Sequence, residues 1–67
     1  MDVSHGIRMA REKAALTQDQ AAIKSGLSKS TIANYENGRR SPRLKELEKM
    51  AKAYNIEVES FLRHARG

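Results

Sequence analysis

The side chains best suited to chemistry in this chain gather on one side of a predicted helix. Advancing 100° per residue over residues 29–37 places five of them within an arc of about 140°: Lys29, Ser30, Ala33, Asn34 and Asn37. Lysine, serine and asparagine can exchange hydrogen bonds with the edges of nucleic-acid bases and with phosphate groups. Ile32 and Tyr35 fall on the opposite side, so we expect the helix to bury them and to present its polar side outward.

The positive charge of the chain is concentrated around the same helix. The net charge is +5, and residues 24–45 contain six basic residues and a single acid, Glu36. The remainder contains seven basic and seven acidic residues and is neutral. A basic patch that coincides with a polar helix surface is typical of proteins that bind a polyanion. The alternative is a charged surface that contacts only solvent.

Two short helices joined by a tight turn are predicted to position this surface. Thr17 is a good N-cap, and Gln20, three residues later, completes a capping box. Gly26 can adopt the positive φ that often ends a helix, and Ser28 can cap the helix that follows. The sequence therefore predicts a helix-turn-helix over residues 18–37.

Three further helices are predicted to build the core. The first spans residues 4–15, with an apolar stripe at helical spacing of Val3, Ile7, Ala10 and Ala14. Another opens at Ser41-Pro42, with serine as N-cap and proline at the first helical position. This helix should end at Asn55. Its buried stripe should consist of Leu44, Leu47, Ala51 and Tyr54, and Met50 should lie at the margin of that stripe. The last runs from Val58 to about His64.

Arg11 and Glu36 are predicted to meet. Arg11 lies at the edge of the first apolar stripe, and Glu36 lies about 40° beyond Ile32 around its helix. Opposite charges at the margins of packed surfaces are costly to bury alone. We therefore expect a partly buried, bidentate ion pair, the alternative being two solvated charges.

Length and composition favour one small intracellular domain, residues 1–67. A chain of 67 residues without cysteine has a small core and no disulfide. The last helix has more apolar surface than a small core needs, so Val58, Phe61 and Leu62 are candidates for a homodimer contact. No apolar run approaches a membrane span and the first residues lack a signal-peptide core, so we expect a cytoplasmic location.

The chain resembles the helix-turn-helix regulators of the Cro/repressor type, also called the xenobiotic-response-element family. The resemblance covers residues 7–62 and is carried by Thr17-Gln18, Ala22, Gly26, Leu27, Ile32 and the run YENGRRSP at residues 35–42. It implies an all-α, five-helix bundle of the lambda-repressor-like type. Ala21 and Ser25 depart from the pattern, since the family usually carries larger apolar residues there, which predicts a lighter core.

The resemblance also implies a function and roles for residues. It indicates a sequence-specific regulator of transcription, acting as a repressor, that binds double-stranded DNA as a homodimer on a pseudo-palindromic operator. Lys29, Ser30 and Asn34 match the base-reading positions, with Ala33 and Asn37 beside them. The residues expected to contact or position the DNA backbone are Thr17, Gln18, Ser28, Arg39, Arg40 and Arg43. An arginine of the first helix often pairs with the glutamate of the ENG motif, in agreement with Arg11 and Glu36.

Two other classes of function are alternatives for this sequence. Some members of the family are antitoxins, so the chain could bind a partner protein and regulate its own operon. An enzyme has the least support, because the sequence has no cysteine, no paired histidines and no glycine-rich phosphate loop. Acidic residues two positions apart, such as Glu46 and Glu48, point in different directions on a helix and do not converge on one substrate. We expect no catalytic residue, metal site or cofactor.

Overall fold

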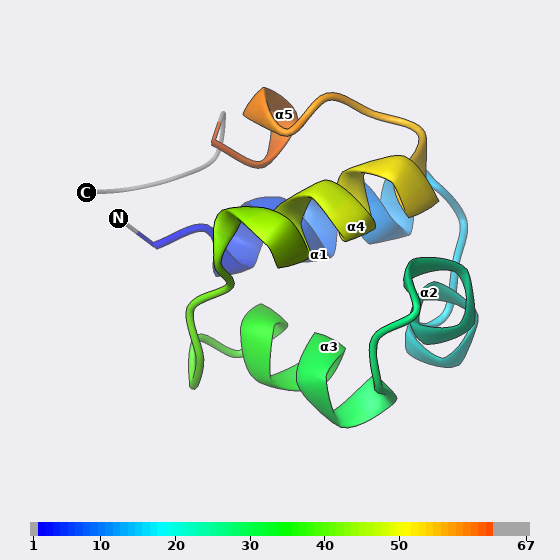
Figure 1. Cartoon of the computed structure of the whole chain (residues 1–67), viewed down its shortest axis with the longest axis horizontal. Coiled ribbons are helices and arrows are strands. Elements are labelled where there is room, and N and C mark those ends of the chain that lie inside the picture. Colours follow the sequence, from blue (N-terminus) through cyan, green and yellow to red (C-terminus); the bar gives the residue numbers. More distant parts are fainter. Residues whose placement is uncertain (1, 63–67) are drawn as a thin grey trace.

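The computed structural model describes residues 2–62 and contains five α-helices in that range. They are α1 (Ser4–Lys13), α2 (Gln18–Ser25), α3 (Lys29–Glu36), α4 (Leu44–Tyr54) and α5 (Glu59–Leu62). In Figure 1, α4 crosses the middle of the bundle, α3 lies along its lower edge, and α5 lies at the top. The all-α, five-helix architecture is the one predicted, and no helix in the described range is long and apolar enough to cross a membrane.

The helix-turn-helix forms as its capping residues predict. The Thr17 hydroxyl accepts a hydrogen bond from the Gln20 N–H (3.1 Å), and the Gln20 side chain accepts one from the Thr17 N–H (2.9 Å). Gly26 ends α2 with a φ of 75°, and Ser28 accepts from the Thr31 N–H at the start of α3. These local bonds fix the lengths of α2 and α3 and the turn between them.

The core is built from all five helices. Nine hydrophobic residues of the described range are buried, and four of them have large side chains with no measurable exposure: Ile7, Ile32, Met50 and Phe61. The predicted light packing around α2 is present, because Ala21 is fully buried and Ser25 is 7% exposed. The Ser25 hydroxyl bonds to the Ala22 carbonyl and the Leu27 N–H, so its burial leaves no polar atom unpaired.

Helices α1 and α4 differ from the prediction at their ends. The first helix ends at Lys13 rather than at residue 15, because the chain turns at Ala15, which has a φ of 59°. The fourth begins at Leu44 rather than at Ser41-Pro42. Arg43 is extended and its N–H donates to the Glu46 carboxylate (3.1 Å), so glutamate provides the cap that we assigned to serine.

The predicted buried stripe of α4 is also wrong at two positions. Leu44 is 64% exposed, whereas Met50, which we placed at the margin, is fully buried. The two residues lie on opposite sides of the Leu47–Tyr54 line of the helix. Met50 belongs to the buried core cluster, whereas Leu44, in the first turn, is left mostly to solvent.

Helix α5 is a single turn that packs on α1. It begins at Glu59, one residue after the predicted start, and its predicted end at His64 lies outside the described residues. Phe61 is fully buried and its ring meets Tyr54 edge to face, with centroids 6.3 Å apart. Gly6 on α1 allows the approach, since a Cβ there would overlap the Phe61 carbonyl oxygen.

Candidate nucleic-acid interface

The outer side of α3 is a polar surface available to a ligand. Ile32 and Tyr35 are buried (0% and 3% exposed), which turns the opposite side of the helix outward. Lys29, Ser30 and Asn37 are exposed, while Ala33 and Asn34 are half-buried. Neither Ser30 nor Asn34 uses its side chain in a hydrogen bond with another described residue. Their donors and acceptors therefore remain available to a ligand.

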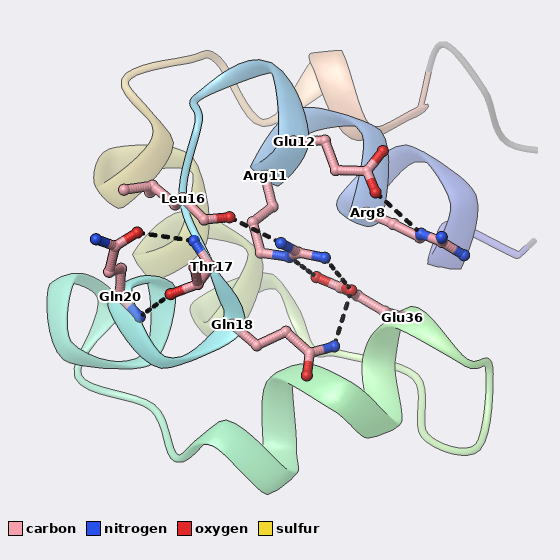
Figure 2. Close-up of polar contacts among 8 residues, drawn as sticks. All are labelled: Arg8, Arg11, Glu12, Leu16, Thr17, Gln18, Gln20 and Glu36. Atoms are coloured by element: carbon pink, nitrogen blue, oxygen red, sulfur yellow. Dashed lines mark hydrogen bonds and ion pairs between the residues drawn. The ribbon is translucent and has the colours of Figure 1, made fainter.

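The Arg11–Glu36 ion pair is present and is mostly buried. The Arg11 Nε donates to Glu36 Oε2 (2.6 Å) and its Nη2 donates to Oε1 (3.0 Å), so the pair is bidentate. The two side chains are only 13% and 5% exposed. The bond to Glu36 raises the pKa of Arg11, and burial of the guanidinium opposes that shift in part. The pair joins α1 to the last turn of α3 (Figure 2).

Gln18 and Leu16 complete a network around this pair. The Gln18 side chain donates to Glu36 Oε1 (3.1 Å), and the Arg11 Nη1 donates to the Leu16 carbonyl (2.7 Å). Figure 2 shows the Glu36 carboxylate between Arg11 and Gln18. A single carboxylate on α3 is thus held by side chains from α1 and α2. This network fixes the orientation of α3 relative to the two other helices.

Two residues of the outer surface have a partner within the protein. The Lys29 ammonium lies 3.5 Å from Asp19, with both side chains well exposed (59% and 70%). Such a surface pair is weak and easily exchanged for another anion. The Asn37 Oδ1 accepts a hydrogen bond from the Arg39 N–H (3.1 Å). Asn37 therefore also shapes the loop that follows α3.

The residues predicted to contact or position the backbone divide into two groups. The hydroxyls of Thr17 and Ser28 are used as helix caps, and Gln18 braces Glu36, so these three position α2 and α3. The side chains of the second group are exposed after the end of α3: Arg39, Arg40 and Arg43. The N–H groups of Arg39 and Arg40 both donate to the Asn34 carbonyl, which ties this basic loop to α3.

Arg8 is a further basic residue at this surface, and the sequence analysis did not identify it as part of the site. Its side chain is 62% exposed and pairs with Glu12 at 3.3 Å. It nevertheless lines one shallow hollow together with Gln18, Ala33 and Asn37, next to the buried ion pair. Arg8 stands one turn before Arg11 on α1, so its helical spacing from Arg11 was the signal that could have identified it.

The three residues predicted for a dimer contact are not equally accessible. Phe61 is fully buried in the core, so its side chain is not available to a second chain, contrary to the prediction. Val58 is half-buried, and Leu62 is 41% exposed. The exposed Leu44, which we expected in the core, lies at the start of α4. In Figure 1, the start of α4 and the end of α5 lie toward the same side of the bundle.

Curated relatives with similar sequences are named as repressors. The chain is 41% identical over 58 residues to the competence pilus inhibition repressor of Acinetobacter baylyi, covering 87% of the chain and 53% of that protein. It is 38% identical over 55 residues to the cryptic phage CTXphi transcriptional repressor RstR of Vibrio cholerae, covering 82% and 50%. The chain therefore spans about half the length of the curated relatives it matches.

Solved structures match over a larger share of their length. The restriction-modification controller protein C.AhdI from Aeromonas hydrophila superposes with a TM-score of 0.85 at 30% identity, covering 90% of this chain and 91% of that one. The wild-type controller protein C.Esp1396I gives 0.82 at 29% identity, covering 92% and 82%. A family model described as helix-turn-helix matches residues 7–61. The chain belongs to this helix-turn-helix family.

Proposed function

We propose that the protein is a sequence-specific regulator of transcription that binds double-stranded DNA and acts as a repressor, not an enzyme. The main support is the outward polar surface of α3, which is held by a buried network and followed by a loop of exposed arginines. The similarity to proteins named repressors and controllers agrees with this assignment.

In this proposal α3 enters the major groove and its outer side chains read bases. Asparagine pairs well with the N6 and N7 atoms of adenine, and lysine with the O6 and N7 atoms of guanine. Asn34 and Lys29 would make these contacts, with Lys29 exchanging Asp19 for the DNA. Ser30 and Asn37 add hydrogen-bonding groups, and Ala33 offers a methyl group for close approach or for a thymine methyl.

The phosphate contacts come from the loop after α3 and from the start of α2. Arg39, Arg40 and Arg43 are exposed and carry no ion pair with a described residue. Arg8 adds a charge on the other side of α3, beside Gln18. Backbone N–H groups at a helix start also bind anions. Phosphate contacts supply most of the affinity, and base contacts supply the specificity.

We infer that the protein binds its operator as a two-fold dimer through Leu44 and Leu62. Both are exposed leucines, and their helix ends lie toward the same side of the bundle. A small dimer of this class reads two half-sites about 34–36 Å apart. Occupying a promoter in this way would exclude polymerase, which is sufficient for repression.

The proposal is tested by selecting bound sequences from a random pool of DNA duplexes. We expect one enriched motif, arranged as an inverted repeat with its half-sites one helical turn apart. Enrichment of no motif at moderate salt would contradict sequence-specific binding. Enrichment of a single, unrepeated half-site would contradict the dimer and retain the base-reading role.

A further inference from the structure

A second hollow, beside the basic loop, is lined by a tyrosine of the core. Arg40, Ser41 and Arg43, between α3 and α4, line a shallow hollow of about 370 Å³ together with Tyr35 of α3 and Glu46 of α4. The three loop residues are exposed, whereas Tyr35 is only 3% exposed. We call this space the α3–α4 hollow.

The hydroxyl of Tyr35 is a polar group that the core presents to this hollow. It forms no hydrogen bond with another described residue. Within residues 2–62, the Tyr54 hydroxyl is the one fully buried polar side-chain group without a partner. The Tyr35 hydroxyl also lacks a partner, so it is not fully buried and reaches solvent where Tyr35 lines the surface, at the α3–α4 hollow.

The charges around this hydroxyl favour an anion. Burial raises the pKa of Tyr35, and Glu46 adds to that rise while Arg40 and Arg43 oppose it. The hydroxyl is therefore protonated at neutral pH and can donate a hydrogen bond. Two guanidinium groups outweigh one carboxylate, and the Glu46 Oε1 already accepts from the Arg43 N–H. An oxyanion, which accepts hydrogen bonds and carries negative charge, fits this set of donors.

The position of the hollow favours a phosphate of the DNA backbone. The loop that lines it is tied to α3, because the N–H groups of Arg39 and Arg40 donate to the Asn34 carbonyl. A helix in the major groove has a phosphate backbone on either side, and we assigned Arg40 and Arg43 to one of these backbones. Tyr35 leaves α3 on the side away from the base-reading surface, so its hydroxyl can meet that backbone beside the arginines but not a base edge.

We propose that Tyr35 is a further DNA-positioning residue, whose hydroxyl donates a hydrogen bond to a backbone phosphate held by Arg40 and Arg43 in the α3–α4 hollow. This inference rests on the proposed function and gives one residue of the core a second role. The ring of Tyr35 packs inside the bundle, and its hydroxyl helps to fix the register of α3 on the duplex.

The test measures binding of the full chain to the selected operator and to a non-operator duplex over a range of salt concentrations. Tyr35→Phe keeps the ring and loses the hydroxyl, so the urea midpoint should be unchanged while the affinity for both duplexes falls roughly three- to tenfold. Because no charge is lost, the salt dependence should stay the same, whereas Arg40→Gln should reduce it by about one phosphate contact.

Tyr54→Phe is a matched control for this variant. It removes the hydroxyl of another buried tyrosine, one that does not line the α3–α4 hollow, and should leave both affinities within about twofold of the wild type. An unchanged DNA affinity of Tyr35→Phe, or an equal loss in Tyr54→Phe, would overturn the inference and leave the proposed function intact. A wild-type protein that prefers no sequence would overturn the proposed function and this role with it.

Single methylphosphonate substitutions along the operator identify the phosphate. At one position, the neutral group should weaken binding of the wild type and of Tyr54→Phe, but should weaken binding of Tyr35→Phe clearly less, because the hydrogen bond is already absent. Equal losses for Tyr35→Phe and the wild type at every position would overturn the contact between the hydroxyl and a phosphate.

Discussion

At the scale of single residues, Glu36 links the candidate interface to α1 and α2. Its carboxylate accepts hydrogen bonds from Arg11 and Gln18, and its side chain is only 5% exposed. A buried charge whose partner is removed keeps its desolvation cost and loses its compensation. The stability of the fold and the orientation of α3 should therefore depend on the same group.

The Arg11–Glu36 pair should be strongly coupled in unfolding. Arg11→Met or Glu36→Gln alone should lower the free energy of unfolding by roughly 3–5 kcal/mol, and the double variant by much less than the sum. The exposed pair of Arg8 and Glu12 is a matched control on α1, and its loss should cost under about 1 kcal/mol. Urea unfolding of the two single variants and the double variant of each pair measures this coupling. Small, additive costs at Arg11 and Glu36 would reject the structural role.

Tyr54 should respond to pH and to loss of its hydroxyl. The hydroxyl is buried with no hydrogen-bond partner in the described range. Burial raises the pKa of Tyr54 to about 12, and Glu36 adds to the shift while Arg11 opposes it. The pKa of Tyr54 in the folded protein lies above the unfolded value of ~10. The contribution of the neutral tyrosine to the free energy of unfolding is therefore complete below pH ~10. It is lost as pH rises toward about 12.

Tyr54→Phe should therefore not lower the free energy of unfolding at neutral pH, and should raise it relative to the wild type at high pH. At neutral pH it should leave the free energy of unfolding unchanged or raise it, because an unpartnered buried hydroxyl costs about 1–3 kcal/mol. Above pH ~10 it should lessen the loss of stability. Urea unfolding at both pH values checks this. A loss of more than about 1 kcal/mol at neutral pH would show that the hydroxyl has a partner.

At the scale of helices, local signals predicted α2 and α3 better than α4. The caps at Thr17 and Ser28 and the turn at Gly26 depend on a few neighbouring residues, so the sequence alone indicated them. The start of α4 was predicted at Ser41, but the Glu46 carboxylate accepts the hydrogen bond of the Arg43 N–H and the helix begins after Arg43. The burial of Met50 instead of Leu44 depended on which side of α4 the rest of the fold covers, which no spacing within α4 reveals.

The candidate site was likewise predictable where it depends on positions within one helix, and not where it depends on how helices cross. The outward surface of α3 and the Arg11–Glu36 pair followed from helical angles and the resemblance, and the structure contains both. The Lys29–Asp19 pair and the place of Arg8 depend on how α1 and α2 cross α3. That crossing is set by packing, which the sequence does not state directly.

The contact between α1 and α5 should be intolerant of a single methyl group. A Cβ at Gly6 would overlap the backbone carbonyl of Phe61, which cannot move without moving α5. Gly6→Ala should therefore destabilise the fold by about 1–3 kcal/mol, although the same change in an open helix stabilises it. Thermal unfolding, with the Phe61 ring signals in NMR, measures the effect. An unchanged midpoint and unchanged ring signals would contradict the close contact.

At the scale of the whole molecule, the two exposed leucines should determine self-association. Leu44→Glu and Leu62→Glu should each place a charge in the proposed dimer contact and shift the protein toward monomer in sedimentation. Ile23→Glu adds the same charge at an exposed residue on α2 and should leave association unchanged. Equal behaviour of all three variants, or a wild-type protein that stays monomeric on a palindromic operator, would contradict the proposed contact.

At the same scale, the proposed mode of DNA binding assigns specificity and affinity to different residues of the bundle. Polar side chains on α3 face outward and make few internal bonds, while the arginines after α3 are exposed and form no ion pair within residues 2–62. Base contacts discriminate between sequences, and phosphate contacts bind all duplexes with a dependence on salt. Variants of the α3 side chains should therefore change the preference between sequences, whereas variants of the arginines should change the affinity for all duplexes.

The most direct test of this account compares Asn34→Ala with Arg39→Ala on the selected operator and on a non-operator duplex, over a range of salt concentrations. Asn34→Ala should cost about 1–3 kcal/mol on the operator and almost nothing on the other duplex. Arg39→Ala should weaken both and reduce the salt dependence by about one phosphate contact. If Asn34→Ala lowered both affinities by the same factor, α3 would not be the helix that reads the sequence.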